Sequence, residues 1–256
     1  MKTTHSILES IVEKGNHEIN REKTGLFLSS LSAGLEIGFG PLLMAVILGL
    51  SATGYGNLGT EIMIAGAYSV GFMFVILGRS ELFTEHNTVA AMPVIDGTAN
   101  FKQLGRVWGI VWSGNILGGL LFTGLALLLA PGSSVIAVEN FGTIAYQLVH
   151  NSSANILVGG IFAGWLMGLL AWLLYSAQST VSRIIFILVV TATIGMLHLP
   201  HSIAGNVEVL LGLFTSSEIT TMSYIKFIVF SSIGNAFGGA VFVGLMKHSH
   251  IVRGAD

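Results

Sequence analysis

Two polar stretches interrupt otherwise apolar sequence, and each carries side chains that can exchange protons or hydrogen bonds. The first, RSELFT at 79–84, follows a nearly uncharged run at 61–78, and the second, LHLPHS at 197–202, follows an uncharged run that begins at 184. Within the second stretch His201 is the strongest candidate for chemistry. An imidazole titrates near neutral pH and can donate a hydrogen bond or a proton to a small solute.

The same residue types could serve a metal site or a hydrolase, and the sequence disfavours both. His198 and His201 lack a third metal ligand at suitable spacing, so His198 is interpreted as structural. Ser80 and Ser202 could act as nucleophiles beside His201, but the chain has neither a Gly-x-Ser-x-Gly nor a His-Glu-x-x-His motif. We therefore expect no enzyme, no metal site and no cofactor.

The composition indicates that membrane helices must position these residues. Of 256 residues, 13 are acidic and 11 are basic, which makes 9% charged, and 52% are hydrophobic. A soluble domain carries about 25% charged residues, so this chain could not cover the surface of a soluble globule. The net charge of −2 leaves no basic excess for nucleic acid, and the lack of Cys excludes disulfides.

Six apolar runs are long enough to cross a hydrocarbon core of about 30 Å as helices. They lie at 26–50, 61–78, 107–130, 155–177, 184–199 with 203–214, and 224–246. Their apolar sequence is continuous rather than alternating, which disfavours a β-barrel. The sequence thus predicts an all-α polytopic protein of the lipid bilayer, with one transmembrane domain over 1–256.

The positive charges of the chain are distributed unevenly about these spans. Nine of the 11 Lys and Arg residues fall on one side of a six-span chain, and the loops 51–60 and 131–154 on the other side carry none. Because Lys and Arg concentrate in cytoplasmic loops, we expect both termini in the cytoplasm.

Residues 1–25 are predicted to form an amphipathic helix. Apolar residues recur at helical spacing, with charged residues opposite: Ile7, Leu8, Ile11, Val12 and Ile19 against Glu9, Glu13, Lys14 and Glu18. The stretch carries four acidic residues and no long apolar core, which is unlike a signal peptide. It fits either an interfacial helix on the cytoplasmic surface or a cap that packs on its own protein.

An internal repeat divides the chain into two halves. Gly, Asn, Gly, Gly, Phe and Gly between Gly114 and Gly124 recur 120 residues later, between Gly234 and Gly244. The chain therefore reads as two three-span repeats, 26–130 and 155–246, and an odd number of spans inverts one relative to the other. Inverted repeats are typical of channels and transporters, with the solute site at the repeat interface. The glycines themselves predict close helix packing.

Spans 2 and 5 correspond in the two repeats, and the two polar stretches break both of them. Pro200 lacks an N–H and disfavours helix just before itself. Because interrupted helices at membrane depth are tolerated where they line a cavity, the paired breaks predict the site of solute permeation.

These features resemble the formate/nitrite transporter (FNT) family: RSELFT in span 2, HSIA at 201–204 in span 5, and the six-span inverted layout over nearly the whole chain. The resemblance implies an aquaporin-like protomer in a homopentamer, with one pore in each protomer. It implies passage of small monovalent anions or their conjugate acids, of the formate, nitrite and hydrosulfide class, with proton coupling left open. A microbial plasma (inner) membrane is the implied location.

The resemblance also implies roles for single residues. His201 matches the central pore histidine of the family, and Thr84 matches the threonine that hydrogen-bonds it. The residues that match the flanking constrictions are Leu82, Phe83, Tyr68, Phe72, Met167 and Ile194. Apolar slits around one polar chamber exclude hydrated ions and admit a small solute that is transiently neutral or hydrogen-bonded.

The sequence departs from the family pattern near the pore. Gly164 stands where formate-type members usually have Asn, and Leu148 stands where an outer lysine is usual. Polar residues gather near the breaks instead: Arg79, Glu81, Glu85, Asn206 and Glu208.

Isolated charges are costly in a membrane, so we expect Arg79 to pair with Glu81, Glu85 or Glu208. The departures leave open a neutral-solute channel on the same fold. A non-conducting membrane scaffold is the remaining alternative.

Overall fold

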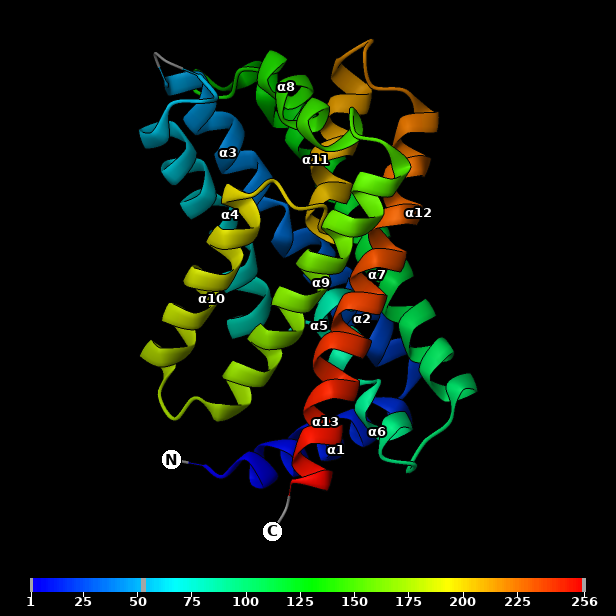
Figure 1. The fold of residues 1–256 in the computed structure, drawn as a ribbon. Coiled ribbons are helices and arrows are strands. Elements are labelled where there is room, and N and C mark those ends of the chain that lie inside the picture. Colours follow the sequence, from blue (N-terminus) through cyan, green and yellow to red (C-terminus); the bar gives the residue numbers. More distant parts are fainter. Residues whose placement is uncertain (1, 52–53, 255–256) are drawn as a thin grey trace.

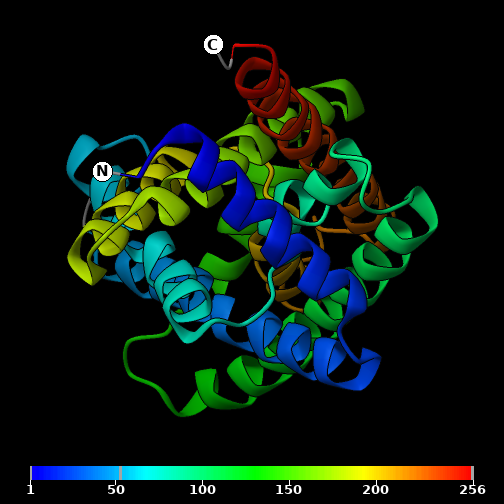
Figure 2. The ribbon, with the colours of Figure 1, turned by 90° about the horizontal axis from the view of Figure 1, so that it is seen from below.

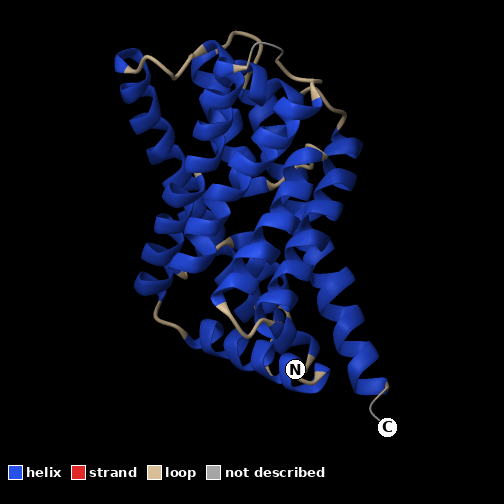
Figure 3. Cartoon of the chain, turned by 90° about the vertical axis from the view of Figure 1, so that its left-hand side faces the viewer, coloured by secondary structure: helices blue, strands red, loops and turns tan. Residues whose placement is uncertain are grey.

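Every regular element in the described part of the chain is a helix, as the continuous apolar runs predict (Figure 3). The structure is a computed structural model that describes residues 2–51 and 54–254. Its elements are α1 (Thr4–Asn20), α2 (Lys23–Ile37), α3 (Phe39–Leu50), α4 (Leu58–Gly78), α5 (Phe83–Val89), α6 (Met92–Ile95), α7 (Phe101–Leu129), η1 (Ala130–Gly132), α8 (Glu139–Val149), α9 (Ser153–Ser176), α10 (Thr180–Met196), α11 (Ser202–Thr215), α12 (Thr221–Phe237), η2 (Gly238–Leu245) and α13 (Met246–Arg253).

Five helical runs in the described ranges are long and apolar enough to cross a membrane: Lys23–Leu50, Leu58–Gly78, Phe101–Gly132, Ser153–Ser176 and Thr221–Arg253. The remaining predicted crossing falls on α10 and α11, which are apolar but span only 17 and 14 residues. Large apolar side chains cover the flanks of the bundle, and Phe101 and Leu128 are each 81% exposed. Such a surface suits lipid, because apolar patches of this extent are rare on proteins that face water.

Both termini lie at one end of the bundle, here called the termini end, together with α6 and α13 (Figure 1). The opposite end, here called the far end, carries α8 (Figure 1). Helix α1 lies across the termini end (Figure 2) and turns Ile7, Leu8, Ile11 and Ile19 inward. These side chains are buried against the rest of the protein.

Small residues bring α2 close to α7, and α9 close to α12. A Cβ added to Gly118 would lie 2.2 Å from the carbonyl oxygen of Leu31, and one added to Gly164 would lie 2.1 Å from that of Asn235. Both separations are shorter than any van der Waals contact, so the two helix crossings require glycine. An asparagine at 164 would not fit against α12, which gives a packing reason for that departure from the family pattern.

Candidate transport site

Two loops end helices inside the bundle and begin new helices there. Helix α4 ends at Gly78 and α5 begins at Phe83, while α10 ends at Met196 and α11 begins at Ser202. Each loop contains a non-glycine residue in the left-handed conformation, Arg79 with φ 62° and His198 with φ 48°. A left-handed residue terminates a helix by turning the chain away from the helix axis.

Asn115 on α7 and Asn235 on α12 hold these two loops with equivalent hydrogen bonds. The side-chain oxygen of Asn115 accepts from the Phe83 N–H at 2.8 Å, and that of Asn235 accepts from the Ser202 N–H at 2.8 Å.

The amide nitrogens of the same two asparagines donate into the loops and the neighbouring helices. Asn115 donates to the Glu81 carbonyl at 2.9 Å and the Ser30 carbonyl at 2.7 Å. Asn235 donates to the Pro200 carbonyl at 2.9 Å and the Gly160 carbonyl at 2.8 Å. Each asparagine therefore bonds to three backbone groups, and the N–H group among them, of Phe83 or Ser202, is one that the start of a helix leaves without an intrahelical partner.

The held loops place Thr84 and His201 in contact at the centre of the bundle. Thr84 Oγ1 and His201 Nε2 are 2.8 Å apart, and their residues are 0% and 1% exposed. His201 is the N-cap of α11, and its Nδ1 accepts from the Ala204 N–H at 3.2 Å. Because a backbone N–H can only donate, Nδ1 is the acceptor nitrogen, and the proton of a neutral imidazole lies on Nε2.

This tautomer fixes what the pair can offer to a solute. His201 Nε2–H donates to Thr84 Oγ1, so the hydroxyl hydrogen of Thr84 remains free to be donated elsewhere. No other residue in the described ranges accepts from it. A proton added to His201 must go to Nδ1, and it would break the cap bond to Ala204.

Aromatic and aliphatic side chains cover this pair toward the far end. The ring of Phe72 meets the His201 ring edge-on at 5.0 Å, and the ring of Tyr68 lies 5.0 Å from that of Phe72. Ile194 is fully buried in the same core cluster. The structure thus brings Tyr68, Phe72 and Ile194 together on one side of His201.

The other apolar residues singled out in the sequence are also buried in this cluster. Leu82 and Met167 are completely buried, and Phe83 is 5% exposed. The Phe83 ring packs edge-on against Trp108 with the ring centroids 6.2 Å apart. Leu82 and Phe83 immediately precede Thr84, as the N-cap and the first residue of α5.

A narrow cavity lies on the far-end side of Tyr68 and Ile194. Its volume is about 10 Å³, about the space that one water molecule requires. Glu208 and His198 also line it, as does Leu148, the position where the family pattern has a lysine.

Two other polar residues near the breaks are engaged in structural contacts. His198 pairs with Glu61 at 3.3 Å, in keeping with its structural interpretation. Asn206 bonds to the Ile116 carbonyl and the Tyr224 hydroxyl, so its side chain links α11 to α7 and α12.

A cluster of charges under the site joins α1 to the loop that precedes α5. Glu81 pairs with Arg21 at 2.7 Å and with His86 at 3.2 Å. Glu18, placed on the polar face of α1 by its sequence, is instead completely buried and bonds to both Lys14 and Arg21.

This cluster corrects the expected pairing of Arg79. Glu81 takes its cations from α1, and no carboxylate oxygen in the described ranges lies within 4.0 Å of Arg79. Glu18, Glu81 and His86 offer three donor atoms within 4.8 Å of one another, a spacing that a metal ion could use. Lys14 and Arg21 already bond to both carboxylates, so they supply the charge that a metal would otherwise provide.

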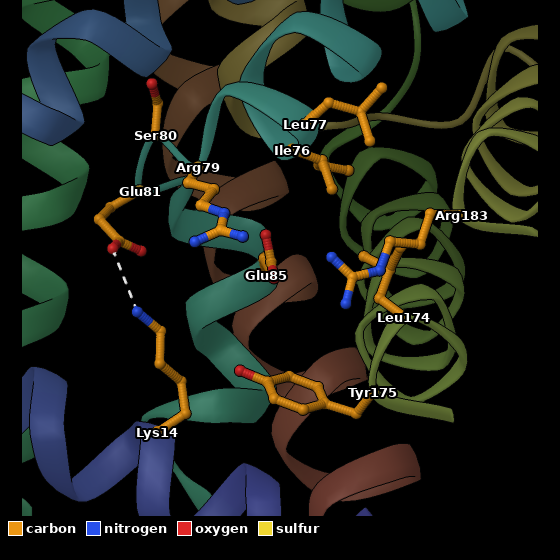
Figure 4. A pocket seen from close by; sticks show the side chains of 10 residues that line it. All are labelled: Lys14, Ile76, Leu77, Arg79, Ser80, Glu81, Glu85, Leu174, Tyr175 and Arg183. Atoms are coloured by element: carbon orange, nitrogen blue, oxygen red, sulfur yellow. Dashed lines mark ion pairs between the residues drawn. The ribbon is translucent and has the colours of Figure 1, made fainter. Parts of the chain in front are cut away.

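Arg79 instead faces a cavity of about 370 Å³ at the termini end. Arg79, Glu85, Tyr175 and Arg183 all point into it, while Lys14 reaches Glu81 across its rim (Figure 4). Lys14 of α1 and Glu85, the residue after Thr84, both line this cavity, which therefore lies between the termini end and the Thr84–His201 pair. The guanidinium groups reach the cavity rather than lipid, which removes the need for a buried carboxylate partner.

We predict that acid releases α1 only well below neutral pH. Burial raises the pKa of Glu18, but the hydrogen bonds from Lys14 and Arg21 and the charges of His86 and Lys14 outweigh it and lower the pKa to about 2. The folded-state pKa lies below the ordinary value of 4.5, so the stabilisation is complete above about pH 4.5 and is lost as pH falls toward 2. Hydrogen exchange of the α1 amides, followed by mass spectrometry across this range, measures the release.

A pair of variants controls this measurement. Glu18→Gln should loosen α1 already at neutral pH, whereas Glu13→Gln, on the exposed face of the same helix, should not. Equal protection of α1 in the two variants would contradict the assigned role of Glu18.

The whole arrangement has counterparts among known proteins. The sequence model of the formate/nitrite transporter family matches residues 5–249. This chain belongs to the formate/nitrite transporter family. Within the curated relatives, the inner membrane protein YfdC of Escherichia coli (strain K12) is 29% identical over 251 residues, which cover 96% of this chain and 78% of that protein.

Solved structures of the formate/nitrite transporter family share the fold. An FNT family ion channel superposes with a TM-score of 0.83 at 20% identity, over 96% of this chain and 97% of that one. A pentameric formate channel with formate bound superposes with a TM-score of 0.77 at 22% identity, over 90% of this chain and 98% of that one. The resemblance carried by RSELFT and HSIA is therefore confirmed at the level of family and fold.

The burial of Glu18 in the charged cluster was not predicted from the sequence, and the family does not by itself reveal it. Ile7, Ile11, Gly15 and Glu18 fall on one face of the helix, because residues three or four apart are neighbours on a helix surface. This spacing is the sequence signal that could have placed Glu18 inside. A Cβ on Gly15 would lie 2.3 Å from the Val89 carbonyl oxygen, which shows how closely that face contacts α5.

Proposed function

We propose that this protein passes small monovalent anions or their conjugate acids, of the formate, nitrite and hydrosulfide class, through a pore in each protomer. The observation that carries the proposal is the Thr84–His201 hydrogen bond, formed where two helices begin inside the bundle. The free hydroxyl hydrogen of Thr84 suits an oxygen or sulfur acceptor with negative charge. The protein acts as a transport protein in this proposal, not as an enzyme.

The surroundings of the pair support selectivity for small, transiently neutral solutes. Tyr68, Phe72 and Ile194 form one constriction, and Leu82, Phe83 and Met167 form the other. An ion that keeps its hydration shell would have to shed water between these apolar walls, at a cost of several kcal/mol or more. A solute that is protonated or hydrogen-bonded at the central pair avoids much of this cost.

The proposal includes a membrane arrangement. Six crossings form two inverted three-helix repeats, 26–130 and 155–246, with the second crossing of each repeat broken at the loops near Thr84 and His201. The equivalent bonds of Asn115 and Asn235 support this repeat. The Lys and Arg distribution supports a cytoplasmic termini end in a plasma (inner) membrane, and the fold shared with a pentameric formate channel supports a homopentamer.

A second candidate, a neutral-solute channel on the same fold, draws support from the far-end cavity. Glu208 and Leu148 line that cavity, where a lysine would attract anions. A carboxyl group at this place does not favour an anion, whereas water, a small polyol or hydrogen sulfide would be unaffected by its charge.

Uptake into proteoliposomes tests the two candidates. Formate, nitrite, hydrosulfide and a neutral polyol are compared at two pH values, with protein-free liposomes as the baseline and His201→Ala beside the wild type. We expect anion uptake that is faster at the lower pH, and we expect His201→Ala to lose this acceleration. Polyol uptake without anion uptake, unchanged in His201→Ala, would overturn the anion pore in favour of the neutral-solute channel.

A further inference from the structure

Two arginines line the cavity at the termini end without a protein partner. Among the residues that the structure describes, neither Arg79 nor Arg183 makes a side-chain hydrogen bond or an ion pair within 4.0 Å. Arg79 belongs to the loop after α4 and Arg183 to the start of α10, and both side chains point into the cavity (Figure 4). Both residues are exposed, so a molecule that enters the cavity can reach their N–H donors.

The backbone of Arg79 indicates that an arginine is required at this place. Its φ of 62° is left-handed, and glycine or asparagine is usual at the end of a helix in this conformation. A larger side chain adds strain there, and strained residues cluster at sites that bind ligands. A glycine would end α4 equally well, but it would bring no charge to the cavity.

The lining of the cavity carries an excess of positive charge. Its two acids are Glu81 and Glu85, and its cations are Lys14, Arg79 and Arg183. Glu81 lies 3.5 Å from Lys14 and also pairs with Arg21 of α1 at 2.7 Å. Glu85 alone cannot compensate both remaining guanidinium groups, so the lining favours an anionic ligand even when Glu85 is ionised.

The size and the donors of the cavity suit a phosphate group. Its volume of about 370 Å³ far exceeds the 10 Å³ of the far-end cavity. Phosphate oxygens accept paired hydrogen bonds from guanidinium groups, and a phosphate monoester carries about two negative charges at neutral pH, which match two arginines. Tyr175 adds a hydroxyl group that points into the cavity and makes no hydrogen bond within residues 2–51 and 54–254.

We propose that the termini-end cavity binds a phosphate monoester group, held by Arg79 and Arg183. The group belongs either to a molecule in solution or to the headgroup of a lipid. Resting on the proposed function, the bound group closes the pore at this end, because the cavity lies between the termini end and the Thr84–His201 pair. The group does not follow the solute through the apolar constrictions, since even one charge is costly at membrane depth.

Equilibrium binding to the detergent-solubilised protein tests the site without any transport. The probe is radiolabelled glycerol 3-phosphate at fixed pH and ionic strength, and radiolabelled glycerol is the uncharged control. We expect saturable binding of glycerol 3-phosphate to the wild type and no binding of glycerol. This comparison does not depend on any variant folding.

Three variants make the binding test specific. Arg79→Gln and Arg183→Gln should each weaken the binding of glycerol 3-phosphate by at least about tenfold, because each removes charge-assisted hydrogen bonds to the phosphate group. Arg253→Gln is the matched control. It removes an exposed arginine at the same end that does not line the cavity, and it should bind like the wild type.

Formate uptake tests the closure and separates the two sources of the phosphate group. Phosphatidylcholine proteoliposomes receive glycerol 3-phosphate on both faces of the membrane, so that the orientation of the protein does not matter, and potassium chloride of equal ionic strength is the control. We expect wild-type uptake to fall, and uptake by Arg79→Gln to stay near the rate of that variant without the probe. A second preparation contains phosphatidic acid, a lipid with the same phosphate monoester, in place of the soluble probe. A fall in uptake only in this preparation would assign the site to a lipid headgroup.

The outcomes distinguish this inference from the proposed function. A wild type that binds glycerol 3-phosphate no better than glycerol overturns the site, as does equal binding by the wild type, Arg79→Gln and Arg183→Gln. Binding that leaves formate uptake unchanged with both sources of phosphate overturns the closure. Absence of uptake for formate, nitrite and hydrosulfide in the wild type without the probe would instead overturn the proposed function, and the binding result would still decide the site.

Discussion

Replacing Thr84 with valine is expected to slow formate uptake by about tenfold to a hundredfold. Valine keeps the shape of threonine but removes the one hydroxyl hydrogen that the central pair leaves free. A hydrogen bond to a charged group contributes about 1.5–3 kcal/mol, and each 1.4 kcal/mol corresponds to a factor of about ten. Initial rates of formate uptake into proteoliposomes, normalised to the amount of assembled protein, measure the loss.

Thr84→Ser is the matched control for this prediction. Serine keeps the hydroxyl group within reach of His201 Nε2, so uptake should stay within a fewfold of the wild type. Uptake by Thr84→Val at the wild-type rate would mean that the free hydroxyl hydrogen does not meet the solute.

Replacing Asn235 with alanine is expected to destabilise the protein by roughly 3 kcal/mol or more, the largest stability change that we predict. The substitution leaves the Ser202 N–H and the Pro200 carbonyl in the loop without their buried partner. Each buried polar group left unpaired costs about 1–3 kcal/mol. Thermal unfolding of the detergent-solubilised protein, monitored by loss of the assembled species, measures the change.

The chain offers a control of the same residue type. Asn155 is exposed on α9, and its side chain makes no hydrogen bond in the described part of the chain. Asn155→Ala should therefore unfold at the wild-type temperature. If Asn235→Ala unfolded at that same temperature, the loop before α11 would be held by contacts other than this side chain.

The sequence predicted the helical class and the family because both depend on local signals. Continuous apolar runs specify membrane helices, and Pro200 disfavours helix at the end of α10. Asn115 and Asn235 are matching positions of the internal repeat, but the spacing of the repeat could not predict that they hold the two loops. Their bonds depend on how α7 and α12 lie beside loops more than 30 residues away.

The electrostatic predictions were less successful, because they depend on which elements meet in space. Arg79 was expected to pair with a nearby carboxylate, but Glu81 takes Lys14 and Arg21 from α1, which lies far away in the sequence. The sequence pattern predicted Glu18 on the polar face of α1. The buried face of this helix includes Gly15 and Glu18 as well as the isoleucines. Only the docking position of α1 decides these partners.

The number of residues between the two partners of each central hydrogen bond sets the order in which these bonds can form during synthesis. The bond from Phe83 to Asn115 spans 32 residues, and the bond from Ser202 to Asn235 spans 33. Each can form as soon as its own half has entered the membrane, because closing a short loop costs little chain entropy. The bond between Thr84 and His201 spans 117 residues and must wait for both halves to dock. A chain interrupted between the halves could therefore form one of the two loop bonds but not the bond between Thr84 and His201.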